Sequence, residues 1–265
     1  MLREISQIPV VILCGGRGTR LKEETEFVPK PLVKIGEKPI LWHIMKIYYA
    51  QGFKKFVLLL GYKGYQIKEY FHQYPIYHSD FTMRQGKTSE IIYHNRPDED
   101  WEVTFVDTGL DTQTGGRIKK AEKFLKDGAF MLTYGDCLAN VDLQKLLESH
   151  YASNKLATVT GVYPPGRFGE MVVSGGDVVS FAEKPPQSKH INGGFFVLGP
   201  KIFTALSGDP LLNFEKHVLP KLAEEKQLAL YAHPGYWQCM DTLHDMELLN
   251  EEWQRGSASW KIWAD

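Results

Sequence analysis

A short apolar run that stops at a pair of glycines decides the class of fold. Val10 to Cys14 is a continuous apolar and β-branched segment, and Gly15 and Gly16 follow it directly. Such a run is typical of a strand that is buried on both faces, as in a parallel sheet covered by helices. We therefore expect an α/β fold in which this strand lies inside the sheet and ends at an edge where ligands bind.

The segments that follow alternate between helix and strand patterns. Apolar residues at helical spacing run from Pro39 to Gly52, a second apolar strand covers Lys55 to Leu60, and another helix is expected from Gly64 to Phe71. Further strands are predicted at 101–106, 129–134, 157–163 and 228–232, and further helices at 116–125, 141–151, 200–206 and 214–225. This order predicts a Rossmann-like, doubly wound sheet that is mixed but mostly parallel, with helices on both faces.

The organisation changes in the second half of the chain. Between Gly166 and Gly199 short strands are separated by pairs of Pro and Gly, which predicts antiparallel hairpins and a smaller antiparallel part. A length of 265 residues fits one large domain. We expect residues 1–150 to form a nucleotide-binding type of sheet, 151–240 a smaller part with ligand contacts of its own, and 241–265 a C-terminal helix and an aromatic tail.

Charge and cysteine content exclude several classes of partner. The chain has 31 Lys and Arg against 32 Asp and Glu, which gives no electrostatic reason to expect nucleic acid or an anionic membrane. No apolar stretch approaches the roughly 18 to 20 residues that span a bilayer, and the run before Gly15 is too short for a signal peptide. Cys14, Cys137 and Cys239 match no zinc spacing, so we interpret them as small buried residues of a cytoplasmic protein.

The loop after the first strand has the composition of a phosphate site. Three glycines allow a positive φ and bring N–H groups close to a phosphate, and two arginines add charge, whereas a structural turn needs no clustered cations. These residues are Gly15, Gly16, Arg17, Gly18 and Arg20. The dinucleotide-binding fingerprint requires a glycine where Leu21 stands, and no P-loop string exists. A hydride-transfer enzyme and a Walker ATPase are therefore disfavoured.

These motifs together resemble those of the sugar-nucleotidyltransferase family. Gly-Gly-Arg-Gly-Thr-Arg-Leu at 15–21 is followed by Lys-Pro-Leu-Val at 30–33 and by Ile-Gly-Glu-Lys-Pro-Ile-Leu at 35–41. Further strings are similar to the glucose-1-phosphate cytidylyltransferase branch of that family. They lie at 42–45, 61–65, 107–109, 114–117, 164–169, 192–196 and 260–263. The resemblance implies Mg²⁺-dependent transfer of CMP from CTP to α-D-glucose 1-phosphate, giving CDP-glucose for the synthesis of bacterial surface polysaccharides.

The resemblance also assigns catalytic and metal-binding residues. Arg20 and Lys30 match residues that hold the triphosphate, and we assign Arg20 to the transferred phosphoryl group and Lys30 to the leaving pyrophosphate. Asp136 and Asp241 match the metal-binding aspartates, and Asp136 also follows a buried strand where an unpaired carboxylate is costly. From its position alone, Asp241 can equally cap a helix that begins near Thr242. The interpretation requires Arg20 and Asp241 to lie together.

The predicted ligand contacts fall into two groups, because 1–150 is expected to be mainly the nucleotide-binding part and 151–240 mainly the sugar-phosphate-binding part. For the nucleotide they are Leu13, Cys14, Gly15, Gly16, Arg17, Gly18, Thr19, Arg20, Lys30, Thr112, Arg117 and Gly135. For the sugar phosphate they are Gly169, Glu183, Lys184, Asn192 and Gly193. Thr112 is expected to read the cytosine edge, and Arg117 to donate to the pyrimidine carbonyl or to the phosphates. In the second group Lys184 would bind the phosphate and Glu183 and Asn192 the hydroxyls, although an ordinary polar hairpin fits the same residues.

Several alternatives remain open from the residues. The glycine loop, Lys30 and the two aspartates would equally serve a sugar-nucleotidyltransferase that uses UTP or dTTP, or a nucleotide-sugar sensor that has lost catalysis. The family resemblance implies a homo-oligomer, a trimer or a hexamer. The tail with Trp260 and Trp263 is either a contact between subunits or a strap over the chain's own core.

Overall fold

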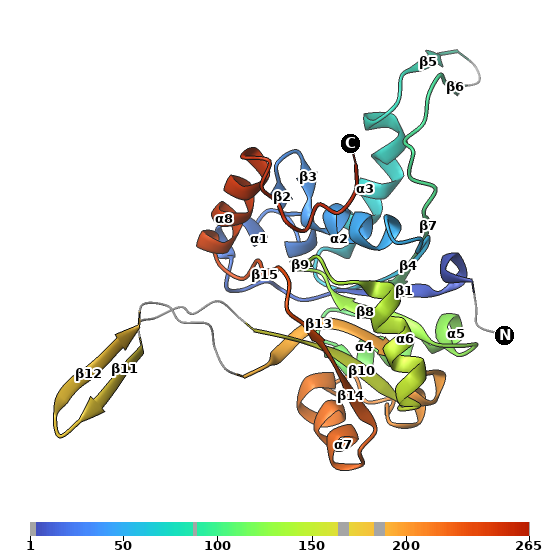
Figure 1. Cartoon of the computed structure of the whole chain (residues 1–265). Coiled ribbons are helices and arrows are strands. Elements are labelled where there is room, and N and C mark those ends of the chain that lie inside the picture. Colours follow the sequence, from blue (N-terminus) through green and yellow to red (C-terminus); the bar gives the residue numbers. More distant parts are fainter. Residues whose placement is uncertain (1–3, 87–88, 164–169, 183–188, 265) are drawn as a thin grey trace.

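The centre of the molecule is a seven-stranded sheet in the order β14-β10-β13-β8-β1-β4-β7 (Figure 1). The computed structural model describes residues 4–86, 89–163, 170–182 and 189–264. In this sheet β13 is antiparallel to both of its neighbours, and the other adjacent pairs are parallel. The strands are β1 (Pro9–Cys14), β4 (Lys55–Leu60), β7 (Glu102–Asp107), β8 (Phe130–Tyr134), β10 (Ala157–Val162), β13 (Ile191–Leu198) and β14 (Leu228–His233). The predicted mixed, mostly parallel α/β sheet is confirmed.

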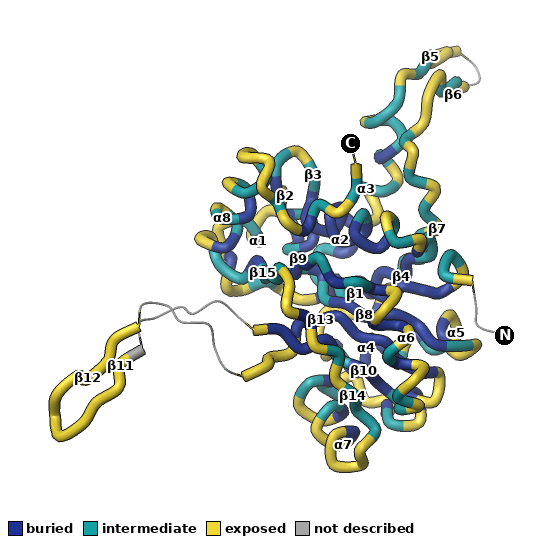
Figure 2. Tube along the Cα trace, viewed as in Figure 1, coloured by how far each residue is buried: buried dark blue, intermediate teal, exposed yellow. Residues whose placement is uncertain are grey.

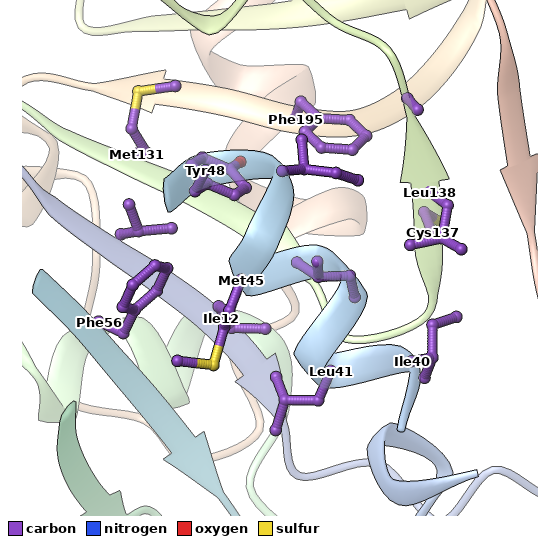
Figure 3. Close-up of a cluster of buried hydrophobic side chains, with 14 of the residues drawn as sticks. Ile12, Ile40, Leu41, Met45, Tyr48, Phe56, Met131, Cys137, Leu138 and Phe195 are labelled. Carbon is purple, nitrogen blue, oxygen red and sulfur yellow. The ribbon is translucent and has the colours of Figure 1, made fainter. Parts of the chain in front are cut away.

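The central strands are buried on both faces by two separate hydrophobic clusters. Along β1, Val10 and Ile12 belong to one cluster and Val11 to the other, as the alternation of side chains in a strand requires. Figure 3 shows helix α2 lying over the first cluster, with Met45 and Tyr48 directed at the sheet. The helices are α1 (Lys22–Thr25), α2 (Ile40–Tyr49), α3 (Gly64–Tyr77), α4 (Thr114–Lys120), α5 (Glu122–Leu125), α6 (Leu143–Ser153), α7 (Leu219–Glu224) and α8 (Leu243–Gln254).

Strand β1 lies where the strand order reverses. It pairs with β4 on one side and with β8 on the other, so the connections that leave these strands diverge to opposite sides. In open α/β sheets such a divergence leaves a crevice at the carboxyl ends of the strands, and ligands bind there. The glycine loop that follows β1 and the Gly135-Asp136 pair that follows β8 both lie at this crevice.

The strands were predicted more accurately than the helices. The observed bounds of β1, β4, β7, β8, β10 and β14 differ from the predicted ones by at most one residue at each end. Helix α3 runs to Tyr77, six residues beyond the predicted end, because Pro75 falls in its last turn and interrupts few backbone bonds. The predicted helix at 214–225 begins as a π-helical turn over Phe214–Val218, since Pro220 cannot donate to the carbonyl four residues earlier.

Short antiparallel hairpins surround the main sheet. The hairpins expected between 166 and 199 are confirmed for β11 (Glu170–Ser174) and β12 (Asp177–Ala182), which project from the body as an exposed ribbon (Figures 1 and 2). Strand β13, in contrast, enters the main sheet. The periodicity did not predict β2 (Lys34–Ile35), β3 (Lys38–Pro39), β5 (Phe81–Arg84), β6 (Glu90–Tyr93), β9 (Cys137–Ala139) and β15 (Trp237–Cys239), which are too short to show a pattern. Short 3₁₀ turns lie at Ile5–Gln7, Lys30–Leu32 and Pro200–Thr204.

The aromatic tail packs on the chain's own core. Trp260 is fully buried, and its ring is stacked near that of Trp253 at a centroid distance of 6.4 Å. The ring of Trp253 also meets the buried His43 of α2 edge-on at 4.7 Å. Of the two interpretations of the tail, the strap over the core is therefore the one that the structure supports for Trp260. Within the described residues, no helix combines the length and the apolar character needed to cross a bilayer.

Two buried histidines predict a loss of stability in mild acid. Burial lowers the pKa of His43 to about 4 and that of His150 to about 4, from an ordinary value of 6.5. Between these values the unfolded chain binds protons that the folded chain does not, so the free energy of unfolding falls as the pH falls. The expected loss is about 2 kcal/mol per histidine between about pH 7 and about pH 5.

Urea unfolding at the two pH values measures this loss. His150→Asn should reduce the difference in unfolding free energy by the share of one histidine, whereas His244→Gln, at an exposed position of α8, should leave it unchanged. An equal pH dependence in the wild type and in His150→Asn would contradict the assignment to that side chain.

Candidate active site

A cavity of about 700 Å³ opens at the carboxyl ends of β1 and β8. Every residue predicted to contact the nucleotide lines this cavity, and so does Asp136. The lining residues not predicted from the sequence are Pro31, Leu110, Asp111, Gln113, Thr114, Tyr134 and Leu211. Four of these, Pro31, Asp111, Gln113 and Tyr134, adjoin predicted positions in the chain. Leu110 and Thr114 each lie two residues from Thr112, and Leu211 comes from a segment without a recognisable motif.

The glycines of the loop serve three different purposes. Gly18 has φ +64°, which favours glycine because other residues are strained there. Gly15 has no positive φ, but a Cβ on it would lie 2.2 Å from the Arg117 guanidinium carbon. Gly16 has no positive φ either, and a Cβ there would meet nothing within 4 Å. Of the three glycines that allow a positive φ, Gly18 adopts one, whereas Gly16 leaves space inside the cavity.

Arg117 fastens the glycine loop to the sheet. Its terminal nitrogens donate to the carbonyl oxygens of Leu60, Gly109, Gly15 and Leu110 at 2.8 to 3.1 Å, and also to the Thr108 hydroxyl. The residue is only 4% exposed. These donors bind protein oxygens, so Arg117 supports the floor of the cavity, which it also lines. Its expected donation to the base or to the phosphates stays a prediction.

Four predicted residues form one ion-pair network. Lys30 Nζ lies 2.7 Å from Asp136 Oδ2 and 2.7 Å from Asp241 Oδ1. Arg20 donates to the second oxygen of Asp241, also at 2.7 Å, across a separation of 221 residues in the chain. Lys30 begins a 3₁₀ turn, Asp136 lies between β8 and β9, and Asp241 lies between β15 and α8. The fold thus brings together the groups that the interpretation required to meet.

The network holds Lys30 in its charged form. Burial alone would lower the pKa of Lys30, but the adjacent carboxylates of Asp136 and Asp241 outweigh burial and raise this pKa above its usual value. The Lys30 side chain is 11% exposed, whereas that of Arg20 is 72% exposed. Lys30 is therefore a fixed cation between two carboxylates, and Arg20 can reach toward a ligand in the cavity.

Asp241 is available to the site because its neighbour caps the helix. The Thr242 side chain accepts from the backbone N–H of Asp245, and the Asp245 side chain accepts from the backbone N–H of Thr242, which makes a capping box at the start of α8. The alternative that Asp241 itself caps this helix is therefore wrong. The carboxylates of Asp136 and Asp241 both contact the Lys30 ammonium and so lie close together. Two adjacent carboxylates are a set of oxygen ligands that fits a hard divalent cation such as Mg²⁺.

The predicted sugar-phosphate residues are placed only in part. Asn192 Nδ2 donates to the Tyr134 hydroxyl at 3.1 Å, and that hydroxyl donates to Glu215 at 2.7 Å. The Gly193 carbonyl accepts from the Trp237 indole at 2.7 Å. Since Tyr134 lines the cavity, Asn192 lies beside its wall. Gly169, Glu183 and Lys184 lie outside the described residues.

Two further side chains link the middle segment to the rest of the site. Arg17 of the glycine loop pairs with Asp111 at 3.0 Å, although both side chains are mostly exposed. Thr112 donates its hydroxyl proton to the Thr108 carbonyl at 2.6 Å and is buried. The Thr112 hydroxyl oxygen also accepts from Lys120 Nζ at 3.5 Å, which leaves one lone pair as an acceptor.

The fold and the site define an α/β protein with a cavity at the carboxyl ends of its central strands and a carboxylate pair beside the glycine loop. The model of the family described as nucleotidyl transferase matches residues 9–254, and the chain belongs to this nucleotidyltransferase family. The glucose-1-phosphate cytidylyltransferase of Salmonella typhi is 48% identical over 255 residues, which cover 96% of this chain and 98% of that protein. The mannose-1-phosphate guanyltransferase of Yarrowia lipolytica is 29% identical over 239 residues, covering 86% of this chain and 59% of its own length. The crystal structure of HddC from Yersinia pseudotuberculosis complexed with GMP-PN matches with a TM-score of 0.68 and 26% identity, covering 93% of this chain and 99% of that one.

Proposed function

We propose that this protein transfers CMP from CTP to α-D-glucose 1-phosphate and releases pyrophosphate. The observation that carries the proposal is the network of Arg20, Lys30, Asp136 and Asp241 at one end of a cavity floored by a glycine loop. The 48% identity to a glucose-1-phosphate cytidylyltransferase, over nearly the whole of both chains, supports the choice of substrates.

The proposed chemistry is a direct in-line displacement. The phosphate oxygen of the sugar phosphate attacks the α-phosphorus of the nucleotide, and pyrophosphate leaves from the opposite side. This step requires no protein nucleophile, and it is the placement of charge that lowers the barrier. We assign Arg20 to the charge that develops on the transferred phosphoryl group, and Lys30 to the leaving pyrophosphate. The exposure of the Arg20 side chain and its single partner in the network support the first assignment.

Asp136 and Asp241 would hold the metal ion. Use of a divalent metal is general in the nucleotidyltransferase family, and we propose Mg²⁺ for this chain. Bound Mg²⁺ would neutralise phosphate oxygens and orient them. Lys30 and Arg20 together carry two positive charges that balance the two carboxylates, and Lys30, which contacts both, reduces the repulsion between them.

The remaining assignments extend the proposal to the whole chain. Residues 1–150 would supply most of the nucleotide contacts and 151–240 most of the sugar-phosphate contacts, through Gly169, Glu183, Lys184, Asn192 and Gly193. The position of Asn192 beside Tyr134 supports this division.

We further propose a cytoplasmic homo-oligomer, a trimer or a hexamer. The absence of disulfides among the three cysteines, all of which are described, supports the cytoplasmic location. The exposed apolar side chains along β11 and β12 support association into an oligomer.

Pyrophosphate release tests the choice of nucleotide. With Mg²⁺ and glucose 1-phosphate, CTP is expected to give a kcat/KM at least about tenfold higher than UTP or dTTP, because hydrogen bonds to the base edge discriminate by about that much. Each nucleotide is assayed alone and in competition. Higher activity with UTP or dTTP would replace CTP as the substrate, and no pyrophosphate with any nucleotide would favour the inactive sensor.

A further inference from the structure

Two cysteines lie directly opposite each other beside Asp136. Strand β9 pairs with β15 in antiparallel register, and Cys137 is the partner of Cys239. The backbone N–H of Met240 donates to the Asp136 carbonyl, and that of Asn140 donates to the Tyr236 carbonyl. Because hydrogen-bonded and non-hydrogen-bonded pairs alternate along an antiparallel ladder, Cys137 and Cys239 occupy a non-hydrogen-bonded pair, where opposite side chains approach most closely.

The Asp136 carboxylate divides its two oxygens between different groups. Oδ2 accepts from Lys30, whereas Oδ1 lies 3.4 Å from Cys137 Sγ and 3.7 Å from Cys239 Sγ. The three ligand atoms of Asp136, Cys137 and Cys239 all lie within 4.8 Å of one another. Cys137 and Cys239 come from two short strands that are held in register, and Asp136 directly precedes the first of them, with its carbonyl bonded to Met240 N–H. The arrangement is therefore fixed by the backbone.

These separations match the edges of a metal tetrahedron. Bonds of about 2.3 Å from zinc to sulfur and about 2.0 Å from zinc to oxygen give edges of about 3.5 Å between sulfur and oxygen in tetrahedral geometry. The two observed Sγ to Oδ1 distances lie within about 0.2 Å of that value. The third edge, between the two sulfurs, lies within 4.8 Å, against about 3.8 Å in such a tetrahedron. A cation between the three atoms would therefore need the sulfurs to approach each other by at most about 1 Å, and its fourth ligand would be water or a phosphate oxygen.

We propose that Asp136 Oδ1, Cys137 Sγ and Cys239 Sγ form a binding site for a thiophilic divalent cation of the Zn²⁺ and Cd²⁺ class. On binding, each thiol releases its proton to water, so two thiolates and one carboxylate surround the cation. The resulting unit carries one net negative charge, which the Lys30 ammonium at Oδ2 neutralises. Mg²⁺ is not the occupant of this site, because hard cations prefer oxygen ligands and thiolates select soft or borderline ones.

The site shares a ligand with the proposed reaction centre. A cation held by the thiols occupies one oxygen of Asp136 and places a second positive charge beside Lys30, so Asp136 no longer serves Mg²⁺. Cations of the zinc class are therefore inhibitors that compete with Mg²⁺. This consequence rests on the proposed function, whereas the binding site itself does not.

Cadmium binding tests the site without reference to activity. Under a phosphine reductant, Cd²⁺ added to the full chain is expected to produce the ultraviolet charge-transfer absorption of cadmium thiolate and to raise the melting temperature. Cys137→Ser and Cys239→Ser should each weaken Cd²⁺ binding by more than about tenfold. Cys14→Ser is the matched control, because this thiol is buried on β1 outside the three-atom cluster, and its absorption should equal that of the wild type.

The outcomes separate the site from the proposed activity. No absorption with the wild type, or undiminished absorption in both Cys137→Ser and Cys239→Ser, overturns the site whatever the turnover. In the activity arm, Zn²⁺ should inhibit Mg²⁺-supported pyrophosphate release by the wild type, and Cys239→Ser should require at least about tenfold more Zn²⁺ for the same inhibition. Cadmium binding without pyrophosphate release under any condition would instead contradict the proposed function and leave the site standing.

Discussion

Asp136→Asn is expected to lower kcat by at least about a thousandfold while the protein remains folded. The amide preserves the size of the side chain but removes the charge that would hold a metal ion and balance Lys30. The effect on stability should be small, about 1 kcal/mol, because the Asp136 side chain is partly exposed and Lys30 keeps its bond to Asp241. Steady-state pyrophosphate release and thermal unfolding of the same preparation give the two numbers.

Asp127→Asn is the matched control for this substitution. Asp127 is exposed in the turn between α5 and β8, so the same change of charge should leave kcat and the melting temperature unaltered. Turnover by Asp136→Asn at a rate close to that of the wild type would refute the role of this carboxylate. A collapse of the melting temperature would assign Asp136 to the fold.

Lys30→Met is expected to reduce both stability and kcat, and to make stability depend strongly on Mg²⁺. Without the ammonium, two partly buried carboxylates lose their shared partner, which should cost about 3 kcal/mol in the absence of metal. Mg²⁺ can restore the missing positive charge, so it should raise the melting temperature of the variant more than that of the wild type. Turnover should remain at least about a hundredfold lower at saturating Mg²⁺, because the leaving pyrophosphate loses its cation.

Melting temperatures measured across a Mg²⁺ titration test this prediction. Lys34→Met supplies the control, since Lys34 is exposed and lies four residues away on β2. Its response to Mg²⁺ should equal that of the wild type. An equal response in Lys30→Met as well would show that the ammonium and the metal do not act on the same pair of carboxylates.

The parts of the fold that could be predicted share a strong local signal. Strands such as β1 and β4 are buried on both faces and appear as continuous apolar runs, so their bounds follow from the sequence. The short pair β9 and β15 has no such run. It depends on a long-range backbone register, which brings Cys137 opposite Cys239, and no spacing of cysteines in the chain reveals that partnership.

The site was predictable where its residues belong to a recognisable string. Arg20 and Lys30 come from two such strings, Asp136 and Asp241 match the family's metal-binding aspartates, and the structure joins all four in one network. The contacts of Arg117 could not be predicted, because its partners are main-chain carbonyls whose positions depend on the folded backbone. The same holds for Leu211, which reaches the cavity from a segment distant in sequence.

The antiparallel strand β13 has a consequence for any attempt to divide this protein. It is inserted between β8 and β10, so residues from the second half of the chain cover the edge of a strand from the first half. A fragment that ended near residue 150 would leave that edge bare, together with the apolar side chains that Phe196 and Leu198 cover. The two parts of the chain therefore share one sheet, and a chimera that joins halves of two relatives near residue 150 has to rebuild the contact between β8 and β13.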